Sequence, residues 1–300
     1  MLKRLCALFA ALILCIPCGL AEEAAPAETL TEEGYFLPPD SEPFRDENTY
    51  ISQNVAIHIT RERVLESDVY VCDIRISSAA CFRRAFGGSR WNRIAAKVDT
   101  LARENDAVLA ITGDSSENLD YGFVLGNGHL YRSNDNKKRD LCVMYKTGEM
   151  KTILASENNM KEVYQQLKDD VDNLWQVFLF GPALLDAEGH AIEDFNSNVK
   201  PANPRSVIGY YEPGHYCFVQ VDGRGVKSAL ESGKKSKGLT LKDLAAYMES
   251  LGCACAYNLD GGPSSMLWFD GVISTPYKNG RKVGDAICIV DLLPRALEND

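Results

Sequence analysis

The sequence contains little histidine and lacks the short motifs that mark two large classes of hydrolase. Its four histidines are scattered through strand-like and turn-like contexts, and no H-E-x-x-H zinc motif is present. The G-x-S-x-G turn that carries the nucleophile of many serine esterases is also missing. A metalloprotease and a serine esterase are therefore both disfavoured. The histidines are His58, His129, His190 and His215.

Clusters of basic residues are also scarce. The chain has 32 Lys plus Arg against 42 Asp plus Glu, a net charge of −10, and its one basic cluster is KKSKG at 234–238. A solvated loop before a helix explains that short cluster. Bulk binding of a polyanion needs clustered Lys and Arg that release counterions. We therefore expect no nucleic acid partner.

The apolar run at the start of the chain is too short to cross a bilayer. It extends from Leu5 to Ile16, whereas a spanning helix needs about 20 apolar residues. A basic start and small residues near position 21 flank it, which is typical of a signal peptide over 1–21. An uncleaved anchor is the less favoured alternative. Cleavage removes two basic residues and no acidic ones, so the mature charge becomes −12. We expect a secreted or cell-surface protein with no stable membrane anchor after cleavage.

Cysteine pairing is poorly supported. Seven cysteines follow the signal peptide, and an odd number cannot pair completely within one chain. Most lie in apolar, strand-like runs, where a thiol packs as a small hydrophobe. Cys72 with Cys81 is the one pair we consider as a disulfide. CAC at 253–255 has no second pair of ligands at zinc spacing, so core packing is favoured.

The order of elements predicts an α+β fold. Residues 22–50 are acidic and proline-containing, which indicates a poorly ordered arm before a domain over 51–300. Strand-like runs outnumber helices, and Asn127-Gly128 predicts a hairpin turn. Helices are expected around Ile94, Val98 and Leu101, at about 158–170, and at about 240–251. We predict a single domain with a mixed, largely antiparallel sheet and a few packed helices.

The stretch NLDGGPSSM, at 258–266, combines an acid, glycines and serines directly after an apolar strand. Strand alternation places Asn258 and Asp260 on one face. Gly261 and Gly262 let the backbone come close to a ligand and offer amide hydrogens to an anion. Ser264 and Ser265 add hydroxyl groups. A purely structural glycine turn, with Asp260 bonding to backbone groups, is an equally weighted alternative.

Three other strand ends also carry a charge beside a glycine or a proline. AVLAITGDSS ends at Gly113 and Asp114, HYCFVQVDGRG ends at Asp222 and Arg224, and NPRSVIG begins near Arg205. Catalytic groups are commonly carried on loops held by a rigid scaffold. We therefore predict that these strand ends converge on one cleft. A structural ion pair with one of the aspartates is the alternative for Arg205.

Six motifs in this order resemble the phosphodiester glycosidase domain family, over about 107–292. They are AITGD, YGFVLGNGHLYRS, FLFGPALL, NPRSVIG, VDGRG and KGLTLKDLAAYMESLGCACAYNLDGGPSSM. The chain departs from the family's pattern where Thr112 replaces Asn and where Ser115 and Ser116 replace aromatic residues. Gly284 and Pro263 differ as well. These departures affect the positions expected to stack on a sugar.

The resemblance implies hydrolysis of a sugar-1-phosphodiester, in exopolysaccharide or cell-wall glycan metabolism. Such reactions pass through an oxocarbenium-like transition state, usually between two carboxyl groups. Asp260 is the first catalytic candidate, and Asp114 and Asp222 compete for the second role. Arg205 suits the phosphate because guanidinium binds its oxygens bidentately. The remaining substrate-binding candidates are Asn258, Gly261, Gly262, Ser264, Ser265, Thr112, Gly113 and Arg224.

Two questions stay open at this stage. The motifs require no cofactor, although the three aspartates have the hard oxygen ligands that calcium or magnesium prefers. A catalytically inactive extracellular relative that binds glycans is the alternative function. The departures at Thr112, Ser115 and Ser116 favour that alternative, whereas Asp260 and Arg205 favour the enzyme.

Overall fold

The computed structural model describes residues 34–89, 91, 94–115, 121–134, 139–195, 197–273 and 280–292. The expected signal peptide, the first part of the acidic arm at 22–33, and Ser116 lie outside these residues. Across the described ranges, no helix is both long and apolar enough to cross a membrane.

The largest sheet has seven strands in the order β1-β2-β3-β4-β13-β12-β16. Every neighbouring pair in it is antiparallel. Its strands are β1 (Phe44–Arg45), β2 (Thr49–Ile51), β3 (Val55–Val64), β4 (Ser67–Ile76), β13 (His215–Val221), β12 (Arg205–Glu212) and β16 (Cys255–Asn258).

Two five-stranded sheets and one short hairpin complete the strands. The second sheet has the order β10-β9-β11-β7-β8 and the third β18-β17-β6-β19-β5. The second sheet contains β7 (Gly122–Gly126), β8 (His129–Asn134), β9 (Leu141–Tyr145), β10 (Met150–Ile153) and β11 (Leu174–Phe178). The third contains β5 (Phe82–Phe86), β6 (Ala107–Thr112), β17 (Leu267–Phe269), β18 (Val272–Ile273) and β19 (Asp285–Val290). The hairpin pairs β14 (Val226–Lys227) with β15 (Lys235–Ser236).

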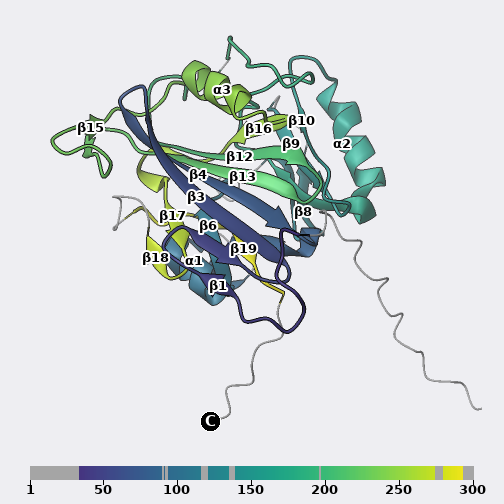
Figure 1. Ribbon diagram of the computed structural model, residues 1–300. Coiled ribbons are helices and arrows are strands. Elements are labelled where there is room, and N and C mark those ends of the chain that lie inside the picture. The colour runs from purple at the N-terminus through teal and green to yellow at the C-terminus, as the bar shows by residue number, and fades with distance from the viewer. Residues whose placement is uncertain are drawn as a thin grey trace, which may run out of the picture.

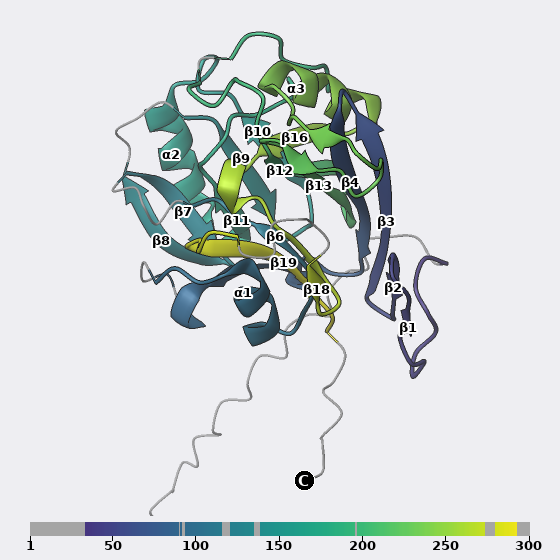
Figure 2. The same ribbon diagram turned by 90° about the vertical axis from the view of Figure 1, so that its left-hand side faces the viewer.

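Each of the three large sheets packs against one helix. α3 (Leu241–Ser250) covers β12 and β13, α2 (Met160–Asp169) covers β9 and β11, and α1 (Val98–Glu104) covers β6 and β19. Figures 1 and 2 show the three helices on three different sides of the molecule. The other faces of the sheets meet in one apolar core.

Phe82 lies where the three sheets meet. Its ring, on β5, is 6.5 Å from the ring of Phe178 on β11 and 5.7 Å from that of Phe218 on β13. All three rings are fully buried. Tilted and edge-on aromatic pairs of this kind contribute about 0.5–1.5 kcal/mol each beyond their burial. The sheets therefore share one packed centre.

The two longer helices lie where the sequence predicted them. α3 begins after Thr240, whose Oγ1 accepts a hydrogen bond from the Asp243 backbone N–H at 3.1 Å, and it is followed by Gly252 at φ 77°. These are the predicted capping box and glycine stop. α1 is shorter than expected, because Ile94 is 54% exposed and lies before the helix, while Ala96 pairs with Val283 as an isolated bridge.

The fold class is confirmed as α+β, but the expectation of one mixed sheet is wrong. The described strands form several sheets, and all their pairings are antiparallel. The predicted hairpin is present, with Asn127 and Gly128 both at positive φ between β7 and β8. β1 falls within the predicted arm and β2 crosses its end, where β2 pairs with β3 and Tyr50 is buried.

The cysteines give a first testable prediction. Cys72 and Cys81 are free in the structure, as are the other five cysteines after the signal peptide, and all seven are buried. Burial raises the pKa of the Cys72 thiol, and a neutral, enclosed thiol is a poor nucleophile. We expect residues 22–300 to react negligibly with Ellman's reagent when native and to titrate seven thiols when denatured. Five thiols after denaturation would instead reveal one disulfide, for which Cys217 and Cys253 are candidates because their sulfurs lie 3.8 Å apart.

Candidate active site

Three strand ends from two sheets meet at one place. β16 ends beside the start of β12, since the two strands are antiparallel neighbours. The Leu259 backbone N–H donates to the Ser206 carbonyl at 2.8 Å, and the Asp260 N–H donates to the Gly113 carbonyl at 3.1 Å. Gly113 directly follows β6 of the third sheet. The loop after β16 therefore lies against the loop after β6.

A cavity of about 350 Å³ opens at this junction. Six of the residues predicted from the sequence line it, and six do not. The lining residues are Arg205, Arg224, Asn258, Asp260, Gly261 and Gly262. The others are Thr112, Gly113, Asp114, Asp222, Ser264 and Ser265. The cavity also includes Phe180, Asn198 and Arg281, which the sequence analysis did not select.

Asp260 is the acidic residue of this cavity. Its Oδ2 accepts a hydrogen bond from Ser115 Oγ at 2.8 Å, and its Oδ1 accepts one from the Gly261 backbone N–H at 2.9 Å. Arg281 Nη2 lies 3.7 Å from Oδ2, and the Asp260 side chain is 12% exposed. The carboxylate is therefore held in place while it keeps access to the cavity. Ser115, one of the departures from the family's pattern, is part of this arrangement.

Arg205 is a buried cation held by backbone carbonyls. Its Nε donates to Leu239 O at 2.9 Å, and its Nη2 donates to carbonyls of residues 199–201 at 2.7–3.4 Å. Burial lowers its pKa to about 10, so it stays charged at neutral pH. Its contacts go to carbonyls, which removes the ion-pair alternative among the described residues. Because these bonds also hold the 199–201 loop, even a lysine at this position would destabilise the fold.

Two further arginines bring positive charge to the cavity. Arg224 is exposed, has φ 54°, and donates from Nε to Asn203 Oδ1 at 3.0 Å. Arg281 is also exposed and lies opposite Asp260. Asn258 contributes a polar wall, since its Nδ2 donates to Gly181 O at 2.9 Å while its Oδ1 has no partner in the described part of the chain. The cavity thus combines one carboxylate with three arginines.

The glycine–serine loop differs from its predicted role. The amides of Gly261 and Gly262 already donate to Asp260 Oδ1 and Pro204 O, so they are not free for an anion. A Cβ at Gly261 would lie 2.7 Å from Pro204 O, and one at Gly262 would lie 2.9 Å from Arg224 Nη2. The glycines therefore permit close packing beside the cavity. Ser264 and Ser265 are fully buried and do not line it.

Thr112 and Gly113 are structural supports. Thr112 is fully buried; its hydroxyl donates to Ser264 O and accepts from the Met266 N–H, and so joins the end of β6 to the segment before β17. A Cβ at Gly113 would lie 2.6 Å from the Asp285 carboxyl carbon. Both residues position the loop that contains Ser115, and neither reaches the cavity.

Comparison with known proteins identifies the family of the chain. The family model described as phosphodiester glycosidase matches residues 105–290, more than half of the chain. The chain belongs to the phosphodiester glycosidase family. Within the described residues, no three His, Cys, Asp or Glu side chains are grouped so that they could hold a metal ion.

Individual relatives are distant. The SPbeta prophage-derived uncharacterized protein YomE of Bacillus subtilis is 27% identical over 215 residues, which cover 67% of this chain and 30% of that protein. The chain thus spans less than a third of that relative. The catalytic domain of zebrafish N-acetylglucosamine-1-phosphodiester alpha-N-acetylglucosaminidase has a similar fold, with a TM-score of 0.57, 15% identity, and coverage of 79% of this chain and 83% of that one. A hypothetical protein from Synechocystis has a TM-score of 0.52, 14% identity, and coverage of 79% and 62%.

In this member of the family, Asp114 belongs to a buried ion network under the cavity. Arg84 Nη2 donates to Asp114 Oδ2 at 3.1 Å, and Arg84 Nε donates to Asp285 Oδ2 at 2.5 Å. All three side chains are fully buried. Burial raises the pKa of Asp114, and the Arg84 charge opposes that effect. Asp114 therefore supports the surrounding loops and does not line the cavity.

The network holds two walls of the cavity. Asp285 Oδ1 accepts hydrogen bonds from the Asp114 and Ser115 amides at 3.0 and 2.9 Å. Asp114 Oδ1 accepts from the Leu179 and Phe180 amides at 2.8 and 2.6 Å. Ser115 contacts Asp260, and Phe180 lines the cavity. Arg84 and Asp285 were missed from the sequence.

Asp222 lies apart from the cavity. It follows β13, is fully buried, and neither carboxylate oxygen has a hydrogen bond of good geometry among the described residues. Burial raises its pKa to about 7, the nearby Asp68 charge adds to the increase, and the Tyr70 hydroxyl opposes it. The protonated acid is therefore the favoured form below neutral pH. This geometry does not support a role for Asp222 at the substrate.

The buried network predicts a large loss of stability when its cation is removed. Arg84→Met keeps the length of the side chain but leaves two buried carboxylates without their partner, which typically costs about 3–5 kcal/mol. Arg83→Met is the matched control, because the neighbouring Arg83 is only half-buried, and it should cost less than about 1 kcal/mol. Urea unfolding of both variants measures the difference. Equal stability of Arg84→Met and wild type would contradict the assignment.

The raised pKa of Asp222 predicts that the free energy of unfolding depends on pH. Its pKa is raised from 3.8 to about 7 on folding, so the folded state binds the proton more tightly and loses stability as pH rises through that window. Asp222→Asn removes the charge. The free energy of unfolding of the variant, relative to that of wild type, should increase between pH 4 and 7. Above pH 7 the difference should stay constant, on the order of 2–4 kcal/mol at most. Thermal unfolding at several pH values measures it, with the exposed Asp169→Asn as control. A pH-independent difference would show that Asp222 does not titrate in this range.

Proposed function

We propose that the protein is a secreted hydrolase that cleaves the bond between a sugar and the phosphate of a phosphodiester. The observation that carries the proposal is the cavity, where Asp260 lies among Arg205, Arg224 and Arg281. The chain as a whole has a net charge of −10, so this local excess of arginine is a specific feature. It suits a substrate with a negative charge next to the reacting carbon.

One carboxylate is enough for this chemistry. When the sugar C1–O bond breaks, the electron pair leaves with a phosphate that already carries negative charge near neutral pH. That leaving group needs less protonation than a sugar alkoxide, so it does not require a second carboxyl group as general acid. Asp260 stabilises the developing positive charge at C1 and promotes attack there. Water supplies the hydroxyl group of the released sugar, and its other proton goes to the released phosphate monoester or to solvent.

The arginines serve the phosphate side. Arg205 is fixed by its carbonyl contacts before substrate binds, so little reorganisation is needed when charge develops on the leaving phosphate. Arg224 and Arg281 are exposed and can approach the phosphate oxygens from the open side. Guanidinium groups bind such oxygens in a bidentate manner. In this arrangement the arginines bind the anionic leaving group, and the Asp260 carboxylate faces the sugar C1.

The sequence and the relatives support the setting. The basic–apolar–small pattern over 1–21 favours export, and glycosyl phosphodiesters occur in exopolysaccharides and wall polymers. The zebrafish relative is named for removal of N-acetylglucosamine from a 1-phosphodiester, so this sugar is the first to test. We expect the substrate to be an extracellular glycan.

A catalytically inactive glycan-binding relative is the second candidate. The observation that favours it is the hydrogen bond from Ser115 Oγ, which occupies one oxygen of Asp260. Incubation of the mature protein with a panel of sugar-1-phosphodiesters separates the two. Free sugar in the products supports the enzyme, while binding without any release supports the alternative.

Asp260 should be essential for turnover. Asp260→Asn preserves the shape of the side chain and removes the carboxylate, so kcat should fall by about 10²-fold or more. The melting temperature should change little, because the amide oxygen can still accept from the Gly261 N–H, while the amide nitrogen can donate to Ser115 Oγ once that hydroxyl reorients. Asp169→Asn on the exposed face of α2 should keep wild-type turnover. An Asp260→Asn enzyme with normal kcat would remove this residue from the mechanism.

A further inference from the structure

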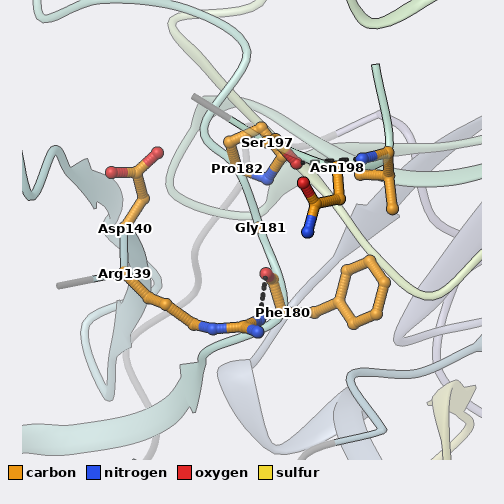
Figure 3. Close-up of a pocket in the computed structure, with 8 residues that line it drawn as sticks. Arg139, Asp140, Phe180, Gly181, Pro182, Ser197 and Asn198 are labelled. Atoms are coloured by element: carbon orange, nitrogen blue, oxygen red, sulfur yellow. Dashed lines mark hydrogen bonds between the residues drawn. The ribbon is translucent and has the colours of Figure 1, made fainter. Parts of the chain in front are cut away.

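A second cavity adjoins the one that contains Asp260. Its volume is about 430 Å³, and Phe180, Asn198 and Val199 line both cavities. Figure 3 shows it, with Arg139 and Asp140 on one side and Ser197 and Asn198 on the other. The two cavities therefore form one groove that continues past Asp260.

Phe180 stands at the junction of the two cavities. Its backbone N–H donates to the buried Asp114, and its carbonyl accepts from Arg139 Nη1 at 3.1 Å. Its side chain is half-buried. A fixed, accessible ring is a suitable surface for the apolar face of a sugar. Phe180 thus brings an aromatic ring to the groove of a chain that has serine at positions 115 and 116.

Arg139 gives the second cavity a cation. Its guanidinium lies 5.6 Å from the ring centroid of Tyr121 and bonds to Phe180 O. The neighbouring Asp140 carboxylate accepts the backbone amides of Ala155 and Ala183 at 2.8 and 3.1 Å. In Figure 3 the Asp140 carboxylate points away from the Arg139 guanidinium. The Asp140 carboxylate is therefore occupied by backbone amides, while the Arg139 side chain extends to the Phe180 carbonyl at the junction of the two cavities.

We propose that the second cavity binds the sugar unit on the alcohol side of the phosphodiester, and that Arg139 recognises a negative charge on this unit. This inference rests on the proposed function, since it extends the same site. Phe180 contacts this sugar unit at the junction of the two cavities. The substrate class is then a polyanionic glycan with phosphate on successive units, rather than a small sugar phosphate.

The kinetic test compares two substrates that share the sugar preferred in the panel. Both are sugar-1-phospho-6-sugars, and one carries an additional phosphate on its second sugar. In the wild type, the charged substrate should have a kcat/KM about ten-fold higher, as one charge-assisted hydrogen bond provides. Arg139→Gln, which retains a donor for Phe180 O, should abolish most of this preference. Lys168→Gln, on the exposed face of α2, should keep it.

A binding test separates this inference from the proposed function. The probes are glycerophosphoglycerol, with one phosphodiester, and the linear glycerol phosphate oligomer with three; neither contains a glycosidic bond. Calorimetry should show about ten-fold tighter binding of the oligomer to wild type and to Lys168→Gln, and a largely lost advantage in Arg139→Gln. If the wild type binds the oligomer more tightly but releases no sugar from any substrate, the proposed function is wrong and the inference about the groove still holds. If a folded Arg139→Gln protein turns over substrate and keeps both the tighter oligomer binding and the preference for the charged substrate, the inference alone is wrong.

Discussion

Arg84 lies fully buried between the carboxylates of Asp114 and Asp285, and much of the site depends on this interaction. An arginine without water is stable only when its donors are satisfied, and each partner here also has further bonds to make. Arg84 Nη1 donates to Val177 O at 3.2 Å. The aspartates accept four backbone amides from two loops. The network around the buried Arg84 thus fixes the backbone positions of residues 114–115 and 179–180.

That geometry explains how three antiparallel sheets build one cavity. The network joins β5, β6 and β19 of the third sheet to the chain that follows β11 of the second. The first sheet contributes the other wall, through Arg205 at the start of β12 and Asp260 after β16. Each wall is anchored on buried strands, and the groups that face substrate project from short loops. A rigid scaffold with functional loops is the usual way to position a catalytic group at low cost in stability.

Much of the fold could be predicted from local patterns, and the network could not. The cap of α3 at Thr240 and the Asn127-Gly128 turn depend on residues a few positions apart, so the sequence displays them directly. The Asp260 loop was visible for the same reason. Arg84 interacts with residues 30 and 201 positions away, and its strand carries two adjacent arginines that resemble an exposed edge. Only the packing of three sheets shows that one of them is buried.

The same limit explains the aspartates. Asp114, Asp222 and Asp260 all follow apolar strands, and a local pattern does not distinguish a carboxylate that accepts buried amides from one that lines a cavity. Their surroundings differ: Asp114 binds Arg84, whereas Asp222 has no cation at hydrogen-bonding distance in the described part of the chain. Asp260 lines a cavity with three arginines, of which Arg281 lies 3.7 Å away. The residues next to Arg281 in the sequence do not mark it as a site residue, because only the fold brings it close to Asp260.

The most direct test of this account is a crystal structure of the protein with a sugar-1-phosphonate diester, in which carbon replaces the scissile oxygen. The account predicts that the sugar C1 lies about 3–3.5 Å from an Asp260 oxygen, the distance of a reactive approach. The phosphonate should contact Arg205 and at least one of Arg224 and Arg281, with the second alcohol group directed past Phe180. A ligand bound with its phosphonate next to Asp260 and its C1 turned away, or bound outside the groove, would contradict the account.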